Sequence, residues 1–344
     1  MQQILNTLYV MTPNAYVHLE NDTLRVDVER EKKLQVPLHH LGSVVCFGNI
    51  MVSPALLHRL ADEGKSLVFL NENGRFKARV EGPVSGNILL RRAHHARAGE
   101  APFALEVAKA CVAGKLRNCR QVLLRGAREN ADSPEQPILA ATAEDLGQAL
   151  RRAELASDLD VLRGVEGDAA KRYFGCLPLV VRAEQREAFA MSGRTRRPPL
   201  DRFNALLSFL YSMLMNDCRS AAESVGLDPQ LGFLHAVRPG RAALALDLME
   251  EFRPVLADRL ALTLVNRKQL VAGDFVVRPG GAVSLEGEAR KQVVTAYQER
   301  KQETLSHPLL ESNVTMGLLA LLQARFLARV IRGEMESYVP FLMR

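Results

Sequence analysis

The chain has 344 residues, of which 47% are hydrophobic and 24% are charged, a balance typical of globular proteins that excludes wholesale disorder. Its length predicts two domains. No run approaches the ~18 uncharged apolar residues that span a bilayer, and the first ten residues do not resemble a signal peptide. Five scattered cysteines without a CxxC pair indicate neither a disulfide framework nor a structural zinc site. We therefore expect a cytoplasmic protein with no membrane partner.

The formal net charge of +6 is distributed unevenly along the chain. Residues 1–82 contain nine basic and nine acidic residues, whereas residues 83–344 contain 36 basic and 30 acidic residues. This asymmetry indicates a phosphate-bearing partner that binds mainly to the second part. The signal is weak by itself, because many basic proteins never bind nucleic acid.

Residues 1–82 predict a small, mostly antiparallel β domain with one helix. Asn-Asp at 21–22 and Asn-Gly at 73–74 suit hairpin turns, and Ser53 suits the N-cap of a helix over 54–63. The linker is expected at 82–86. The expected strands are short and rich in β-branched residues, and they cover 5–11, 15–20, 24–28, 33–36, 43–47, 66–70 and 75–80.

From residue 83 to 344 the apolar residues recur with a period of 3.6, which predicts an all-α domain. A basic loop over 193–199 and one β-hairpin over 275–285 interrupt the helical pattern. The complete chain is therefore expected to have an α+β fold, with the β domain first. The expected helices cover 87–98, 104–126, 143–163, 166–174, 178–190, 202–224 and 315–332.

Glu166 lies between two glycines, Gly164 and Gly167, within a helical pattern. Each interior glycine costs a helix roughly 1 kcal/mol relative to alanine. Glycines also let another backbone or a ligand approach closely, which makes Glu166 a candidate site residue. The alternative interpretation is a helix break with an exposed glutamate.

Two further segments, 226–235 and 244–254, place polar residues among apolar ones. The first begins with an Asp-Pro turn and ends at His235, which is either a ligand or a hydrogen-bonded core residue. In a helix, Asp247 would lie near Glu250 and Glu251, three and four residues later. Their apolar neighbours favour burial over a solvated face, and buried carboxylates repel one another unless a cation compensates them.

Two carboxylates and one imidazole form a donor set of two oxygens and one nitrogen. This set suits Mg²⁺ or Mn²⁺ better than a structural zinc site, which prefers thiolates or more imidazoles. An ion with open coordination positions can bind a phosphate oxygen and stabilise an in-line displacement. The spacing alone does not establish such a site, because these residue types are common.

Four motifs are more specific: LRGVEGDAAKRYF (162–174), SGRTRRPPLDRFNALLSFLYS (192–212), GLDPQLGFLHAVRPGRAALALDLMEEFRP (226–254) and DFVVRPGGAVSLEGEARK (274–291). Through them the chain resembles the CRISPR-associated endonuclease and integrase of the spacer-acquisition step, the first Cas protein family. The resemblance extends over essentially the whole chain. The continuous loop GRTRRPP is most similar to that of the subtype I-C-like branch.

The resemblance implies a set of site residues. The metal-binding and catalytic residues of the family fall on Glu166, His235 and Glu250. Many members have aspartate at the last position, so Glu250 is a departure that lengthens the side chain. Asp247 matches an acidic position near the ion and Asn204 a polar residue close to the site. Whether Asp247 or Glu251 also contacts the ion stays open.

The resemblance also implies a reaction and its partners. The 3′-hydroxyl of a short double-stranded DNA fragment attacks a phosphodiester at the boundary of the CRISPR repeat, with Mg²⁺ or Mn²⁺ and no nucleotide cofactor. The family works as homodimers, paired through the N-terminal domain, and a dimer of the small second Cas protein bridges two of them. A catalytically silent DNA-binding scaffold and a branched-DNA repair nuclease using the same site are the alternatives.

Two groups of arginines are candidates for DNA contacts. Arg194, Arg196 and Arg197 lie in the Pro-ended loop and could bind phosphates, or the loop could simply be solvated. A stripe of arginines on the last predicted helix could contact successive DNA phosphates, or it could form the solvated side of a core helix. The absence of Trp argues against a base-stacking platform for single strands. The stripe consists of Arg325, Arg329 and Arg332.

Overall fold

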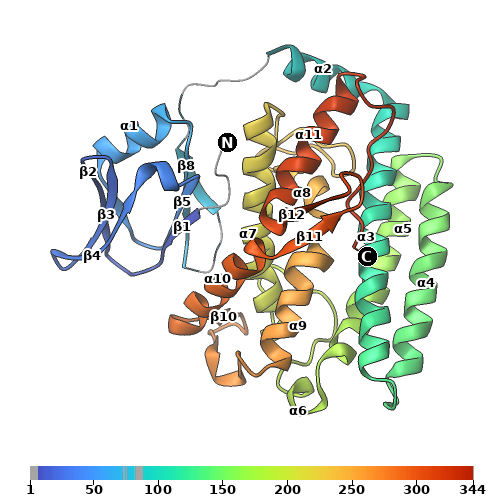
Figure 1. Cartoon of the computed structure of the whole chain (residues 1–344). Helices are drawn as coiled ribbons and strands as arrows, with labels where there is room; N and C mark the ends of the chain where they lie inside the picture. The colour runs from blue at the N-terminus through green and yellow to red at the C-terminus, as the bar shows by residue number, and fades with distance from the viewer. Residues whose placement is uncertain (1–6, 73, 75, 81, 83–87, 344) are drawn as a thin grey trace. The chain divides into compact units, whose positions relative to one another are not determined.

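The computed structural model describes residues 7–72, 74, 76–80, 82 and 88–343. The chain divides into two compact units, Met1–Ser85 and Gly86–Arg344. Most of the predicted linker at 82–86 lies outside the described residues. The first unit consists mainly of strands and the second mainly of helices, which confirms the predicted α+β fold (Figure 1).

Two four-stranded sheets form the first unit. The helix α1 (Pro54–Asp62) contacts strands of both sheets, and the Ser53 side chain caps it by accepting a hydrogen bond from the Leu56 N–H at 3.3 Å. The first sheet has the order β1 (Thr7–Val10), β5 (Ser43–Phe47), β7 (Ser66–Leu70) and β8 (Phe76–Val80). The second has the order β4 (Glu31–Pro37), β3 (Thr23–Val28), β2 (Tyr16–Glu20) and β6 (Met51–Val52).

The prediction of a mostly antiparallel domain is wrong in one respect. Of the six pairings between the strands described in this unit, three are antiparallel and three are parallel: β1 with β5, β5 with β7, and β2 with β6. For β5 and β7 the reason lies in the connection, which passes through β6 and α1 and returns the chain in the same direction. The predicted turn at 21–22 does join an antiparallel pair, with Asn21 at a φ of 54°.

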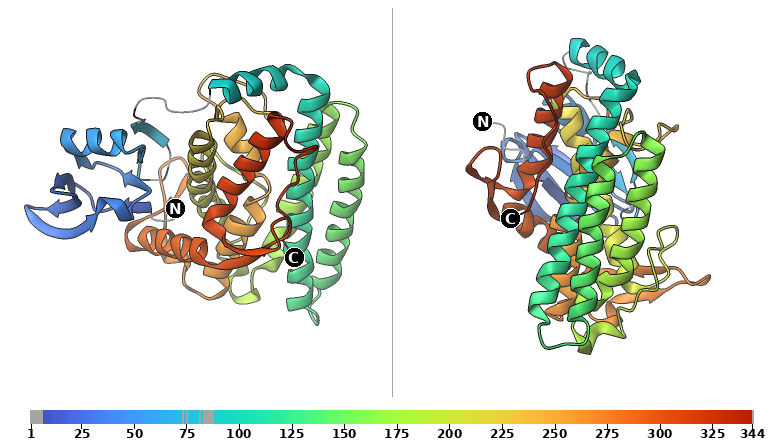
Figure 2. Two further views of the ribbon diagram at one scale, coloured as in Figure 1. Left: turned by 45° about the horizontal axis from the view of Figure 1, so that its top comes forward. Right: turned by 90° about the vertical axis from the view of Figure 1, so that its right-hand side faces the viewer.

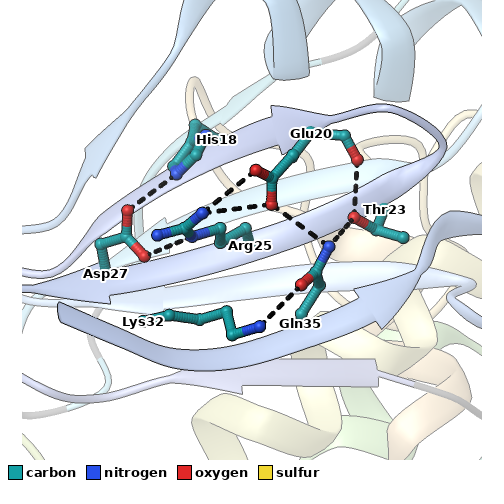
Figure 3. A network of polar contacts seen from close by, with 7 residues as sticks. All are labelled: His18, Glu20, Thr23, Arg25, Asp27, Lys32 and Gln35. Carbon is teal, nitrogen blue, oxygen red and sulfur yellow. Dashed lines mark hydrogen bonds and ion pairs between the residues drawn. The ribbon is translucent and has the colours of Figure 1, made fainter.

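One face of the second sheet is buried and the other carries a polar network (Figure 3). Val17 and Leu24 point into the core, so their alternate neighbours point outward. On the outer face Arg25 donates to Asp27 at 2.7 Å and to Glu20 at 3.1 Å. His18 lies 3.0 Å from the same aspartate, and Gln35 joins Glu20 to Thr23. These contacts offset the charges of this face, as the neutral balance of residues 1–82 requires.

The second unit is a helical body in which α3, α4 and α5 lie side by side (Figures 1 and 2). Two small hairpins accompany the helices, β9 (Phe275–Val277) with β10 (Val283–Leu285) and β11 (Thr304–His307) with β12 (Ser312–Thr315). The longer helices are α2 (Ile88–Gly99), α3 (Ala101–Glu129), α4 (Gln136–Glu154), α5 (Leu159–Cys176), α7 (Arg202–Val225), α10 (Gly287–Gln302) and α11 (Leu319–Ile331). The shorter ones are η2 (Leu177–Val180), α6 (Ala183–Arg186), α8 (Ala243–Met249), η3 (Arg253–Asp258), α9 (Arg259–Asn266), η4 (Ala272–Asp274) and η5 (Met316–Leu318).

Three predictions for this unit need correction. The helix expected over 143–163 is broken between α4 and α5, where the Asp158 carboxylate accepts hydrogen bonds from two N–H groups and caps α5. The apolar pair at 155–156 continues the helical pattern and hides this break. The segment 178–190 contains only short helical turns, and the hairpin of β11 and β12 was not expected, so the unit is not all-α.

No helix among the described residues has both the length and the hydropathy needed to cross a membrane. All five cysteines are buried and free of disulfide bonds.

Candidate active site

Two of the predicted site residues meet on a lysine that the sequence analysis missed. Lys115 lies on α3, which packs against both α5 and α8 (Figure 1). Its ammonium contacts the Glu166 carboxylate and lies 2.8 Å from Glu250 Oε2. Burial alone would lower the pKa of Lys115, but Glu250 and Glu166 outweigh burial and raise it. Two carboxylates 84 positions apart in the sequence therefore share one ammonium group.

His235 joins the same cluster through Asp247. The Nδ1 atom of His235 lies 2.7 Å from Asp247 Oδ1, and its Nε2 atom lies 3.6 Å from Glu250 Oε1. Asp247 also accepts backbone N–H groups from Phe233 at 2.6 Å, Leu234 at 3.0 Å and His235 at 3.0 Å. Because an ionised carboxylate only accepts hydrogen bonds, Nδ1 donates to Asp247, and Nε2 is the ring nitrogen that faces Glu250.

Gly232 allows this loop to fold onto α8. A Cβ atom at position 232 would lie 2.7 Å from Asp247 Oδ2 and 2.8 Å from the carbonyl carbon of Ala243. Pro229 accepts the N–H groups of Leu244 at 3.0 Å and Ala245 at 3.4 Å, which satisfies donors at the start of the helix. The sequence between the Asp-Pro turn and α8 is therefore built to place the histidine and aspartate together.

Glu250 is a buried carboxylate in a positive environment. Burial would raise its pKa, but the Arg253 guanidinium and the Lys115 ammonium, with His235, hold the pKa well below its usual range. Arg253 lies 3.1 Å from Glu250 Oε1. The other oxygen, Oε2, is buried and lies 2.8 Å from the Lys115 ammonium group. Both carboxylate oxygens of Glu250 therefore face a cationic side chain.

Glu166 lies within an unbroken helix, so the interpretation as a helix break is wrong. Its side chain is 25% exposed. A Cβ atom built at Gly164 or Gly167 would have no neighbour within 4 Å among the described residues. Among the residues that the structure describes, no other segment therefore packs against these glycines. They leave the helix surface beside Glu166 open.

Glu251 belongs to a different network from its neighbour Glu250. The helix α8 ends at Met249, so Glu250 and Glu251 point in different directions. Glu251 accepts hydrogen bonds from the Tyr338 hydroxyl at 2.5 Å, from Gln323 at 3.1 Å and from the backbone N–H of Phe341. Burial, opposed by these donors, raises its pKa to about 8. Glu251 thus anchors the C-terminal segment.

Behind the cluster, a buried carboxylate joins two tyrosines. Asp258 accepts hydrogen bonds from Tyr211 at 2.6 Å and Tyr173 at 2.8 Å. The guanidinium groups of Arg253 and Arg194 each lie 5.2 Å from the centre of the Tyr211 ring. Burial raises the pKa of Asp258 to about 6 against the opposing effect of the tyrosines.

This raised pKa predicts a pH dependence of stability. Asp258 holds its proton more tightly in the folded protein than in the unfolded chain. Its contribution to the free energy of unfolding is therefore fully present below the ordinary pKa of 3.8 and is lost as the pH rises past about 6. The free energy of unfolding of the Asp258→Asn variant should not show this decrease, which amounts to about 3 kcal/mol at most. Urea denaturation at several pH values between 4 and 7.5 measures it, with the exposed Asp145→Asn as the control. Parallel profiles for wild type and Asp258→Asn would contradict the assignment.

Asn204 forms its side-chain hydrogen bonds with the basic loop and with the start of α7. Its side-chain amide donates to the Gly193 carbonyl at 2.8 Å and to Asp201 at 2.6 Å. Its carbonyl oxygen accepts from the Arg194 side chain at 2.7 Å and the Thr195 N–H at 3.1 Å. The resemblance implies that Asn204 lies near the site. In the structure Asn204 supports the loop at the start of α7.

The three arginines of the loop differ in their surroundings. Arg194 is half-buried and also donates to Ser208 at 3.1 Å, so it fastens the loop to α7. Arg196 and Arg197 are exposed. A role of these residues in binding DNA stays a prediction, with Arg196 and Arg197 in the accessible positions.

Three further arginines, Arg163, Arg238 and Arg241, which the sequence analysis missed, lie near the loop after the histidine. Arg163 donates to the Leu234 carbonyl at 2.8 Å. Partial burial lowers the pKa of Arg241, the positive charges of Arg238, Arg197 and Arg163 lower it further, and the Asp247 carboxylate opposes them. A cluster of positive charges of this kind favours binding of an anion. The sequence motif HAVRPGR carries the signal that could have identified them.

The arginine stripe on α11 is exposed, as the pattern predicts. Arg332 and Arg329 lie 2.5 Å and 3.5 Å from Glu334, which offsets part of their charge. These contacts favour the solvated-face interpretation of the stripe.

The sequence matches the family model "CRISPR associated protein Cas1" over residues 8–299. It is 54% identical over 344 residues to a CRISPR-associated endonuclease Cas1 of Moorella thermoacetica, covering 100% of both chains. It is 50% identical over 348 residues to one of Rhodospirillum rubrum, again covering 100% of both. The subtype I-C-like branch stays a prediction.

Solved structures share the fold. A Cas1 protein from Thermotoga maritima superposes with a TM-score of 0.83 at 24% identity, covering 98% of this chain and 100% of that one. A casposase bound to an integration product also reaches 0.83, at 20% identity, with 97% and 92% covered. A Cas6-RT-Cas1–Cas2 complex gives 0.83 at 25% identity, with 98% of this chain and 36% of the other covered. The family match and the two full-length relatives establish that the chain belongs to the Cas1 family of CRISPR-associated proteins.

Proposed function

We propose that this protein is a divalent-metal-dependent DNA endonuclease and integrase that inserts short DNA fragments into a CRISPR array. The relatives named as endonucleases and the casposase bound to its integration product support the proposal. The observation that carries it is that Glu166 and Glu250 share the Lys115 ammonium group, while His235 Nε2 lies 3.6 Å from Glu250 Oε1.

The donors at this point fit Mg²⁺ or Mn²⁺. Two carboxylates and one imidazole would hold the ion. Within the described part of the chain no three such side chains are already spaced to hold a metal, and Lys115 lies between Glu166 and Glu250. Asp247 would act on the ion only through His235, because its oxygens are engaged by that ring and by backbone N–H groups. When bound, the ion would polarise the phosphate and offset the charge that develops on it.

The protein's own groups perform the remaining tasks. Asp247 keeps His235 in the tautomer that leaves Nε2 free. The open surface of α5 beside Glu166 gives the substrate access. The arginines at 163, 197, 238 and 241 would bind phosphates on either side of the reacting one.

In the proposed reaction the 3′-hydroxyl of a fragment attacks a phosphodiester at the boundary of the repeat. One phosphorus–oxygen bond forms while another breaks, and the leaving 3′-oxygen takes up a proton, so no nucleotide cofactor is needed. The reverse reaction, and hydrolysis with water as the nucleophile, would use the same residues. A branched-DNA repair nuclease would therefore have the same site, and the choice of substrate separates the two functions.

Strand transfer of a labelled duplex fragment into supercoiled DNA carrying a repeat tests the proposal. It is run with Mg²⁺ or Mn²⁺, with and without the small second Cas protein. Labelled plasmid joined at the repeat is the expected product. If no transfer occurs with any metal while DNA still binds, the catalytically silent scaffold becomes the better description.

The basic loop yields a separate prediction about DNA affinity. Replacing Arg196 and Arg197 together by glutamine should weaken duplex binding and reduce the salt slope by up to about 2, or ~0.9 per lost phosphate contact. Titration of labelled duplex at several salt concentrations measures both effects. The exposed pair Lys32 and Lys33, replaced by glutamine in the neutral first unit, provides the control. An unchanged slope in the loop variant would place DNA elsewhere.

We also propose that the protein forms a homodimer through its first unit, and that a dimer of the small second Cas protein bridges two such dimers. The Cas1–Cas2 complex among the structural neighbours supports the second partner. Tyr16 and Met51 are paired across β2 and β6 and are 40% and 58% exposed, which gives the outer face an apolar end. Light scattering should therefore report about twice 38.1 kDa. A monomer at micromolar concentration would contradict the dimer.

A further inference from the structure

Lys115 occupies a position that its own helix makes possible. A Cβ atom at the preceding Gly114 would lie 3.1 Å from Glu251 Cβ and 2.8 Å from Pro340 Cβ. The glycine therefore lets α3 approach the chain beside Glu250 more closely than any larger residue would. The Lys115 side chain, only 5% exposed, extends from this point of closest approach to both carboxylates.

Two cations offset the two carboxylates that contact Lys115, without a metal ion. Glu166 and Glu250 contribute two negative charges, and Lys115 and Arg253 contribute two positive ones. A buried carboxylate without a compensating cation is strongly destabilising. The lysine thus provides for the metal-free protein the positive charge that an ion would otherwise have to supply.

The two cations differ in how firmly they are held. The Arg253 guanidinium lies 3.1 Å from Glu250 Oε1 and over the Tyr211 ring at 5.2 Å, which fixes its plane. Lys115 has a flexible stem of four carbons and a point-like ammonium group that contacts Glu166 and lies 2.8 Å from Glu250 Oε2, with no ring or planar fork to fix it. The lysine is therefore the cation that can move.

We propose that Lys115 is an internal counter-ion that holds Glu166 and Glu250 together in the metal-free protein and that an arriving divalent ion displaces from between them. This inference rests on the metal site of the proposed function. It adds a residue that sets how tightly the metal binds, and it makes metal binding an exchange of one cation for another.

The proposal predicts two effects of opposite sign. Without Lys115 the two carboxylates repel each other, so the metal-free protein becomes less stable. An ion no longer competes with an ammonium group, so it binds more tightly, by about tenfold or more. A lysine that merely supported the fold would weaken metal binding when removed, because the ligands would lose their arrangement.

Lys115→Met removes the charge and keeps the length of the side chain. Lys109→Met on the same helix is the matched control, because Lys109 pairs with Glu106, a surface residue on the same helix, at 3.2 Å. Thermal unfolding in EDTA reports the metal-free stability, and Mn²⁺ titration followed by electron paramagnetic resonance reports affinity. Combining Lys115→Met with Glu166→Gln removes both charges and should restore the melting temperature in EDTA.

The expected result is a lower melting temperature in EDTA, tighter Mn²⁺ binding and a larger rise of melting temperature with Mn²⁺ for Lys115→Met only. If Lys115→Met binds Mn²⁺ as wild type does or more weakly, or if the charge-balanced double variant is not rescued, the displacement is wrong while the metal site stands. Wild-type protein that binds no Mn²⁺ would overturn the metal site and the displacement together.

Discussion

Replacing His235 by alanine should reduce strand transfer by about a thousandfold or more while leaving duplex affinity within about twofold of wild type. Its Nε2 atom faces Glu250 at 3.6 Å, where the ion is proposed to bind and act on the reacting phosphate. Affinity instead comes from many arginine–phosphate contacts, each sensitive to salt. Glu166→Ala should behave in the same way, and the loss of its negative charge should tighten DNA binding slightly.

Strand transfer and duplex titration on the same preparations measure this separation. His58→Ala, an exposed histidine on α1, is the control and should change neither quantity. If the His235 variant stays folded but loses binding and transfer in parallel, His235 is better described as a core residue that supports the DNA-binding surface.

Asp247→Ala should destabilise the protein by about 3 kcal/mol or more and abolish strand transfer. The substitution removes the acceptor of three backbone N–H groups and of His235 Nδ1, all enclosed by protein. Each buried donor left without a partner costs about 1–3 kcal/mol.

Urea denaturation at neutral pH measures the loss of stability. Asp145→Ala breaks a surface ion pair with Arg172 and should cost less than about 1 kcal/mol. A loss for Asp247→Ala as small as that of the control would mean that the loop does not depend on this carboxylate.

Local patterns predicted much of the fold. The strands over 43–47 and 66–70 and the helix from residue 202 follow from side-chain alternation and capping signals that act within a few residues. The break before α5 was missed because apolar residues at 155–156 continue the helical period. Parallel pairing in the first unit was missed because it depends on a crossover and on contacts distant in the sequence.

The candidate site also contains some residues that the sequence could predict and others that it could not. Glu166, His235 and Glu250 could be named from the donor chemistry and the family resemblance. The structure links Glu166 to Glu250 through Lys115 and places His235 Nε2 3.6 Å from Glu250, and their role as metal ligands stays a prediction. Lys115 could not be named, because nothing near it in the sequence shows that α3 passes beside Glu250. Glu251 could not be separated from Glu250 until the end of α8 at Met249 was known.

The binding of one ion by Glu166, His235 and Glu250 is the central claim, and anomalous diffraction from crystals soaked in Mn²⁺ tests it most directly. The account predicts one anomalous peak within about 2.0–2.6 Å of a carboxylate oxygen of Glu166, of His235 Nε2 and of a carboxylate oxygen of Glu250. Lys115 Nζ should then have moved from between the two carboxylates. A peak held by other residues, or none at this point in crystals that bind Mn²⁺ elsewhere, would contradict the account.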